Sequence, residues 1–272
     1  MAVRPLDWES GLVESGDMNV LWIHAHPEPR SLGGMLAAEG RRALVESGHA
    51  VCVSDLYAMR WNPVVEAADF GHDPACRLHV GAASRRAYDA GGLRADIAAE
   101  QDKLRWAEAV VLQFPLWWLG PPAILKGWLD RVLVHGFGFG VTDPVTGTVR
   151  RYGDGELAGK RGLVVTTIGA RESSFGPRGI HGHLDDVLFP LHHGVFWYTG
   201  MEALPPLAVY GADRADEPAA AGALARLRRR LAGLATEEPL PFRSEHGGDY
   251  DTDLVLRPGL SPGRSGLAVH YR

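Results

Sequence analysis

The chain has 272 residues, 46% of them apolar, which is enough length and apolar content for a substantial hydrophobic core. Its formal net charge of −5 argues against a general nucleic-acid binder, which would present a basic surface. The two cysteines, Cys52 and Cys76, give neither a disulfide framework nor a metal-binding spacing, so no metal site is expected.

The N-terminal segment, residues 1–17, carries five charged side chains and lacks the apolar run of a signal peptide. We interpret it as a loosely held N-terminal extension. No apolar run in the sequence approaches the roughly 20 residues of a membrane-spanning helix. The sequence therefore predicts a cytoplasmic protein without a membrane span.

A strand–turn–helix unit is predicted at the start of the main domain, with the strand at 18–25 and the helix at 35–46. The turn between them precedes a helix N-terminus, where free N–H groups and the helix dipole attract anions. Such a loop is, on its own, more often an ordinary turn than a phosphate site. It lacks Gly-x-Gly-x-x-Gly, so a Rossmann-type nucleotide site is not indicated. The candidate anion-binding residues are His26, Ser31, Leu32 and Gly33.

The next segment of the chain gives weaker signals. Residues 50–55 predict a second strand, and residues 96–108 predict a helix. Between them, residues 60–94 show no clear periodicity and are expected to be irregular.

An apolar strand predicted at 109–114 ends at Pro115, which has no N–H for the sheet ladder. Trp117 and Trp118 follow, and a Gly-Pro-Pro turn leads into a helix that continues to Val132. Ligands of α/β proteins bind at the carboxyl edge of the sheet, where two indoles would suit a flat ring. Considered alone, the tryptophans could equally be core residues, since aromatic side chains are usually buried.

The rest of the chain completes an α/β pattern and then loses it. Two strands and two helices are expected, at 161–167, 207–210, 184–196 and 219–234. Five strands alternating with helices predict a doubly wound parallel sheet in one domain, residues 18–235. Residues 236–272 are rich in proline, glycine and charge, and are expected to form an extended C-terminal arm.

Two motifs in this sequence resemble a known family. The stretch Gln113-Phe-Pro-Leu-x-Trp, followed by Pro122-Ala-Ile-Leu-Lys-Gly-Trp, is similar to the NAD(P)H:quinone oxidoreductases, also called DT-diaphorases. The resemblance covers roughly residues 18–272. It implies a flavodoxin-like strand order and ping-pong hydride transfer from NAD(P)H through a flavin to a quinone or another flat aromatic acceptor. The long arm favours FAD over FMN.

The resemblance also assigns cofactor contacts. The flavin diphosphate would lie at the first strand–helix loop, and the ring would lie beside the tryptophan loop and the end of the fourth strand. Ile168 stands where the family has a glycine, so the backbone contact at that point differs. The implied cofactor-binding residues are His26, Ser31, Leu32, Gly33, Pro115, Leu116, Trp117, Trp118, Leu119, Thr166, Thr167, Ile168 and Gly169.

His181 is the expected catalytic residue, because the matching family histidine relays the proton that accompanies hydride transfer. An imidazole reaches both charge states near pH 7. Without the resemblance, this histidine would more often be structural. Phe175 replaces a family tyrosine, and Phe139 and Val141 replace two more. The implied substrate-binding residues are Trp118, Leu119, Phe139, Val141, Phe175, His181 and Tyr198.

The resemblance further implies a homodimer, in which the arm packs at the interface and lines the partner's site. Two other functions stay open. One is a flavin-dependent reductase of azo, nitro or biosynthetic aromatic compounds. The other is a non-catalytic regulatory subunit of a potassium-efflux antiporter, a role that a related, shorter branch of the family serves. The arm argues against the second.

Overall fold

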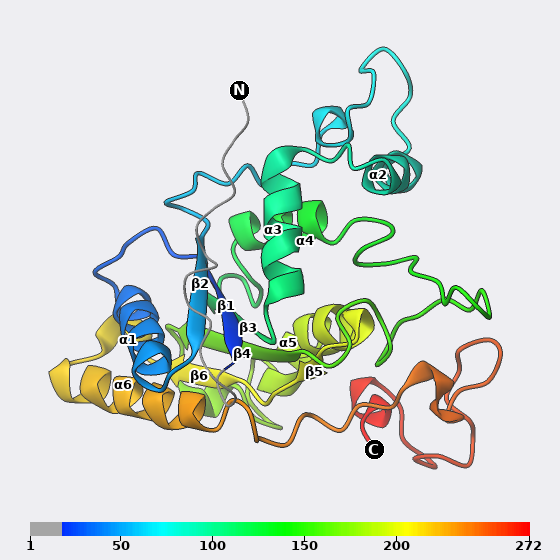
Figure 1. Ribbon diagram of the computed structural model, residues 1–272. Coiled ribbons are helices and arrows are strands. Elements are labelled where there is room, and N and C mark those ends of the chain that lie inside the picture. Colours follow the sequence, from blue (N-terminus) through cyan, green and yellow to red (C-terminus); the bar gives the residue numbers. More distant parts are fainter. Residues whose placement is uncertain (1–17) are drawn as a thin grey trace, which may run out of the picture.

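A computed structural model describes residues 18–272, so the expected extension at 1–17 lies outside the described residues. A parallel sheet in the order β2-β1-β3-β4-β5 forms its centre, and β6 also pairs with β4 (Figure 1). This order confirms the expected flavodoxin-like α/β fold. The strands are β1 (Asn19–His24), β2 (Ala50–Asp55), β3 (Ala109–Pro115), β4 (Arg161–Ile168), β5 (Glu202–Ala203) and β6 (Leu207–Tyr210).

The fifth position of the sheet holds two short strands instead of one. β5 pairs with the beginning of β4, and β6 pairs with its end. Leu204 extends the first pairing through its N–H to the carbonyl oxygen of Gly162, at 2.8 Å. Pro205 and Pro206 then have no N–H to donate, so the ladder breaks. The sequence predicted only the second of these strands.

Helices cover both faces of the sheet (Figure 1). α1 and α6 pack on one face, while α3, α4 and α5 contribute to the larger core on the other. β3, buried at every position, is the central strand between them. None of the described helices is long and apolar enough to cross a membrane. The helices are α1 (Leu32–Glu46), α2 (Val80–Asp89), α3 (Ala95–Trp106), α4 (Ala123–Val132), α5 (Leu184–Leu191) and α6 (Glu217–Ala232).

Two helix predictions need correction. α1 begins at Leu32 rather than residue 35, because the Ser31 side chain caps it by accepting the N–H of Gly34 at 3.0 Å. The segment 60–94, expected to be irregular, contains α2 and a 3₁₀ turn. His79, at the cap position of α2, makes no side-chain capping bond, so the usual start signal is missing from the sequence.

The helix expected at 184–196 is interrupted. α5 ends at Leu191 and a π-helix, His192–Trp197, follows it. Pro190 has no N–H for the helical ladder, which favours a break near this point. His192 is fully buried in the π-helix, and neither ring nitrogen has a hydrogen-bond partner among residues 18–272. Burial lowers the pKa of His192 from 6.5 to about 4.

This buried imidazole should make the fold sensitive to acid. Because the folded pKa is lowered, the unfolded chain binds more protons between pH 6.5 and 4, and stability falls as the pH falls through that window. From pH 7 to pH 5, His192 alone should remove about 2 kcal/mol. Urea unfolding at the two pH values should show a smaller loss in His192→Leu. An equal loss in the variant would assign the acid sensitivity to other groups.

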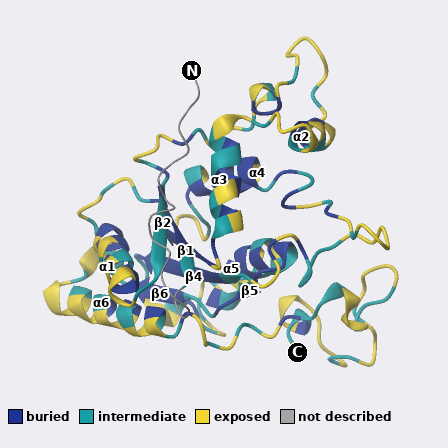
Figure 2. Cartoon of the chain, viewed as in Figure 1, coloured by how far each residue is buried: buried dark blue, intermediate teal, exposed yellow. Residues whose placement is uncertain are grey.

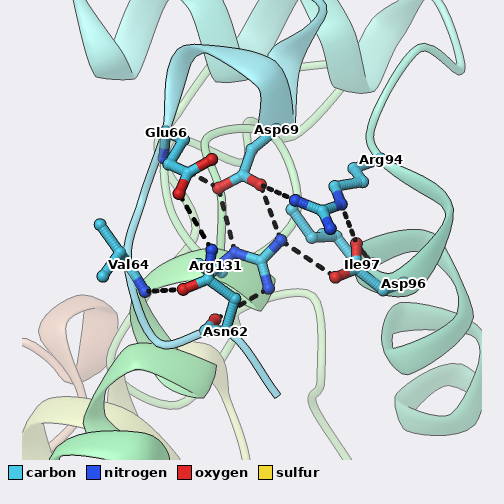
Figure 3. Close-up of polar contacts among 8 residues, drawn as sticks. All are labelled: Asn62, Val64, Glu66, Asp69, Arg94, Asp96, Ile97 and Arg131. Atoms are coloured by element: carbon cyan, nitrogen blue, oxygen red, sulfur yellow. Dashed lines mark hydrogen bonds and ion pairs between the residues drawn. The ribbon is translucent and has the colours of Figure 1, made fainter. Parts of the chain in front are cut away.

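A buried ion pair holds the segment before α3 against α4 (Figure 3). Arg131 of α4 donates to the carboxylate of Asp69 at 2.7 and 3.0 Å, and both side chains are fully buried. Arg131 also donates to Asp96 and to the carbonyl oxygen of Asn62, at 3.1 and 3.0 Å. Its guanidinium lies 4.5 Å from the ring centroid of Trp61. The cluster thus fixes the helix that follows the tryptophan loop.

The C-terminal arm, residues 236–272, contains only short 3₁₀ turns and packs beside α5 and the π-helix of its own chain (Figure 1). Its anchors include Phe242, which is buried, and a hydrogen bond from the Trp197 indole to the carbonyl oxygen of Arg243 at 3.0 Å. Arg151 pairs with Glu245 at 2.6 Å. Most of the arm is half-buried or exposed (Figure 2).

Candidate active site

A cavity of about 800 Å³, the main cavity, opens at the carboxyl ends of β1, β3 and β4. Every residue expected to bind the cofactor lines it except Thr166. That threonine is fully buried, and its hydroxyl has no partner among the described residues. The lining residues are His26, Ser31, Leu32, Gly33, Pro115, Leu116, Trp117, Trp118, Leu119, Thr167, Ile168, Gly169, Ala170, Phe175, His181, Ala212, Asp213 and Arg214.

The N-terminus of α1 forms one end of the main cavity. Ser31 fixes the loop before it: its hydroxyl donates to the carbonyl oxygen of Glu28 at 2.7 Å and lies 3.1 Å from Nδ1 of His26. The first N–H groups of a helix have no intrahelical acceptor, so Leu32 and Gly33 present donors there. With the positive end of the helix dipole, these donors suit a phosphate.

A buried side-chain network ties this helix end to the sheet. The Gln113 side-chain oxygen accepts from the Trp22 indole at 2.8 Å and lies 3.1 Å from Nδ1 of His24. These contacts orient the amide so that its nitrogen donates to the carbonyl oxygen of Gly33 at 2.6 Å. The side chains are buried, and burial lowers the pKa of His24, which favours its neutral form. Gln113 therefore holds the first turn of α1 in place.

Replacing Gln113 with leucine should weaken binding at the α1 N-terminus. The change frees the carbonyl of Gly33 and leaves the Trp22 indole without its acceptor, and lost buried hydrogen bonds cost about 1–3 kcal/mol. We expect FAD affinity to fall roughly tenfold, measured by titration calorimetry. Gln101→Leu is the matched control, because Gln101 is equally buried but bonds Val132 at 2.8 Å, remote from the cavity lining. Equal affinity losses in both variants would point to general destabilisation.

The tryptophan loop forms a second wall. Trp118 and Leu119 have φ values of 51° and 59°, a left-handed conformation that is unusual for large side chains. Reciprocal hydrogen bonds between the backbones of Trp117 and Gly120, both 3.0 Å, close the turn. The Trp118 side chain is 103% exposed relative to its reference state. Backbone strain held in place beneath exposed apolar surface is typical of a ligand-binding loop.

His181 reaches the main cavity from a turn rather than from the helix start expected for it. α5 begins three residues later, capped by His183. The N–H of His181 donates to the carbonyl oxygen of Ser174 at 3.0 Å, and its ring lies 4.9 Å from that of Phe175, which is buried. The Ser174 hydroxyl donates to Arg171 at 2.6 Å and so is already engaged.

The sequence reasoning missed Ala212, Asp213 and Arg214. They follow β6 and line the main cavity. Arg214 donates to the carbonyl oxygen of Gly169 at 2.9 Å, while the Asp213 carboxylate occupies space that a side chain at Gly169 would need. Their position after a predicted strand was the available signal, because every strand end of a parallel sheet meets the same edge.

A second cavity of about 400 Å³, the side cavity, adjoins the first at Leu119. Phe139 and Tyr198, both expected to bind substrate, line it. The Phe139 ring stacks on His135 at 5.0 Å. Val141 lines neither cavity and is mostly buried. Within residues 18–272, no cluster of three or more histidine, cysteine or acidic side chains could hold a metal ion.

Comparison with known proteins gives first the class. Residues 18–231 match the model of a protein family described as having the flavodoxin-like fold. The chain is 44% identical over 263 residues to the ribosyldihydronicotinamide dehydrogenase-like protein traD of Penicillium crustosum, covering 94% of this chain and 96% of that protein. The human ribosyldihydronicotinamide dehydrogenase (quinone) is 36% identical over 225 residues, covering 82% and 94%.

Two further matches narrow the class. The rat NAD(P)H dehydrogenase (quinone) 1 is 35% identical over 224 residues, covering 82% of this chain and 79% of that protein. A candidate quinone reductase from Klebsiella pneumoniae, known from its crystal structure, superposes with a TM-score of 0.91 at 47% identity, covering 94% of this chain and all of that chain. The chain belongs to the NAD(P)H:quinone oxidoreductase family and is an oxidoreductase, which confirms the expected family.

Proposed function

We propose that the protein is an FAD-dependent NAD(P)H:quinone oxidoreductase that transfers a hydride from NAD(P)H to a quinone in a ping-pong reaction. The observation that carries the proposal is the convergence of the α1 N-terminus, the tryptophan loop and the end of β4 on one cavity. The names of its relatives support the same reaction. A cytoplasmic location is proposed with it.

The residues of the main cavity fit a flavin. Its volume, about 800 Å³, suits a large ligand. Unpaired helix N–H groups at one end match a diphosphate, and the exposed rings of Trp117 and Trp118 match a flat heterocycle. When bound, a flavin supplies the hydride acceptor and donor that no side chain provides.

The chain's own residues divide the remaining work. Leu32 and Gly33 bind the diphosphate through their N–H groups, and the strand-end backbone at Thr167–Gly169 orients the ring edge. Trp118 forms an apolar slot with the side-cavity residues, which excludes water while the nicotinamide and then the quinone occupy it. A ring nitrogen of His181 holds, and then releases, the proton that accompanies hydride transfer.

The purified protein itself tests the proposal. It should show the visible absorption of a bound flavin, and the released cofactor should be FAD. Turnover with NADH and NADPH should be faster on a panel of quinones than on azo, nitro or biosynthetic aromatic compounds. A colourless protein that does not bind FAD would refute the flavin assignment, and faster azo or nitro reduction would replace the proposed acceptor.

We also propose a homodimer in which the C-terminal arm lines the partner's site. The arm presents Leu254 and Val255 to solvent, 48% and 59% exposed, and both apolar side chains would be covered at an interface. Phe139, at the rim of the side cavity, is also exposed.

Deleting residues 245–272 should lower quinone turnover more than FAD affinity, because the main cavity contains no arm residue. Steady-state kinetics and calorimetry would measure the two effects. Leu254→Ser with Val255→Ser in the full chain is the matched variant, since it keeps the pair of Arg151 with Glu245. Unchanged turnover and acceptor preference in both proteins would exclude the arm from the site.

A further inference from the structure

A third cavity of about 310 Å³, the arm cavity, lies between the C-terminal arm and the body of the domain. It shares no lining residue with the main cavity or the side cavity. Its volume is at the lower end of the roughly 300–1,000 Å³ typical of small-molecule sites. Six of its lining residues are Tyr152, Phe189 and His193 from the domain, and Arg243, Tyr250 and His270 from the arm.

Two stacked pairs of rings form the walls of the arm cavity. Phe189 and His193 stack at 4.6 Å with 17° between their planes. On the arm, Tyr250 and His270 stack at 6.0 Å and 20°. The two walls meet where His193 lies 5.6 Å from His270. Tyr152 adds a third ring, 4.8 Å from His193. Such walls favour a planar aromatic guest.

The charges at the arm cavity are paired. Arg243 is held by Asp249 at 2.7 Å and by the carbonyl oxygen of Val269 at 3.1 Å. Glu245 is bound to Arg151 at 2.6 Å. Burial lowers the pKa of His193 to about 4, and burial followed by the charge of Arg243 lowers the pKa of His270. The lining therefore offers neutral imidazoles near pH 7, which favours an uncharged guest.

Polar atoms remain available in the arm cavity. His193 has four ring contacts but no hydrogen bond within residues 18–272. Nδ1 of His270 lies 2.9 Å from the Tyr250 hydroxyl, which leaves Nε2 of the imidazole for another partner. A neutral imidazole both donates and accepts, so it suits a hydroxyl group. Tyr152 and Leu254 hold left-handed backbone conformations, with φ of 51° and 63°.

From this geometry we propose that the arm cavity is a second ligand site, which binds a neutral phenol or hydroquinone of one or two fused rings. The ring stacks between the two aromatic walls, and its hydroxyl group bonds His193 or His270. Tyr152 of this cavity contacts Tyr198 of the side cavity edge-on, with ring centroids 5.0 Å apart. A bound phenol is therefore one ring pair away from the proposed acceptor site.

Titration calorimetry with 2-naphthol, a phenol that is not a hydride acceptor, tests this site on the full-length protein saturated with FAD. We expect saturable binding that weakens about three- to tenfold in His193→Phe and in His270→Phe, since each variant removes a hydrogen bond but keeps a ring. Phe139→Ala, which alters the side cavity, is the matched control and should leave this affinity unchanged. In the wild type, the Cε1 proton resonances of His193 and His270 should shift on addition of 2-naphthol, whichever variant folds.

Three results would overturn the proposal: no saturable binding to the wild type, equal affinity in the wild type and both histidine variants, or loss of binding in Phe139→Ala alone. The last would place the phenol in the side cavity. Because the measurement needs no turnover, it is separate from the proposed reaction. A protein that reduces no quinone would defeat the proposed function and leave this test standing.

Discussion

Replacing His181 with alanine should slow the reduction of bound flavin by NADH and NADPH by about a hundredfold. General acid–base assistance is typically worth about a hundred- to ten-thousand-fold, and solvent that reaches the half-exposed imidazole position should keep the loss near the lower end. His181 has no tyrosine partner, because its ring neighbour is Phe175 at 4.9 Å and the nearby Ser174 hydroxyl is engaged. The imidazole therefore works without a neighbouring phenol.

Stopped-flow absorbance would measure the effect, with two matched variants. His181→Gln keeps a hydrogen-bond donor and should be slowed less than His181→Ala. Phe175→Tyr restores a hydroxyl on a ring of the same shape, and should leave the rate unchanged or raise it modestly. Wild-type rates in His181→Ala, with FAD fully bound, would show that His181 only shapes the turn before α5.

Asp69→Asn should cost about 3–5 kcal/mol of folding free energy, because it leaves the fully buried guanidinium of Arg131 without its main counter-ion. Asp96 is a weaker substitute, since it is one-third exposed and contacts Arg131 at 3.1 Å. Urea unfolding at pH 7 would measure the loss.

The same helix supplies the control for this prediction. Lys126 and Asp130 form an exposed pair in α4, at 2.6 Å, and Asp130→Asn should cost about 1 kcal/mol or less. In the double variant Asp69→Asn with Arg131→Met, the total loss should be smaller than for Asp69→Asn alone, because no unpaired charge remains. A loss below about 1 kcal/mol for Asp69→Asn would mean that the buried pair is dispensable.

The sequence predicted the sheet well because its strands have a strong local signal. β3 is a continuous apolar run that ends at a proline, and the structure has it one residue longer than expected. The short pieces escaped prediction: β5 is only two residues long, and α2 lacks a capping side chain. Their positions are set by pairing with β4 and by packing against the 3₁₀ turn, which are contacts distant in sequence.

The candidate site shows the same division. Motif spacing and resemblance named the loops after β1, β3 and β4, since each loop follows a recognisable strand. Arg214 and Asp213 carry no motif, and only the fold shows that they reach the carbonyl and the empty side-chain space of Gly169. The role of Gln113 was also hidden, because its partners Trp22 and Gly33 are 91 and 80 residues away.

The exposed indole of Trp118 gives the molecule a built-in optical reporter. Its surroundings are water, so its fluorescence should resemble that of free tryptophan, whereas the indoles of Trp22 and Trp128 are shielded by the core. A yellow cofactor in the main cavity would absorb part of this emission through energy transfer. Occupancy of the site can thus be followed by the quenching of one tryptophan, and Trp118→Phe supplies the blank.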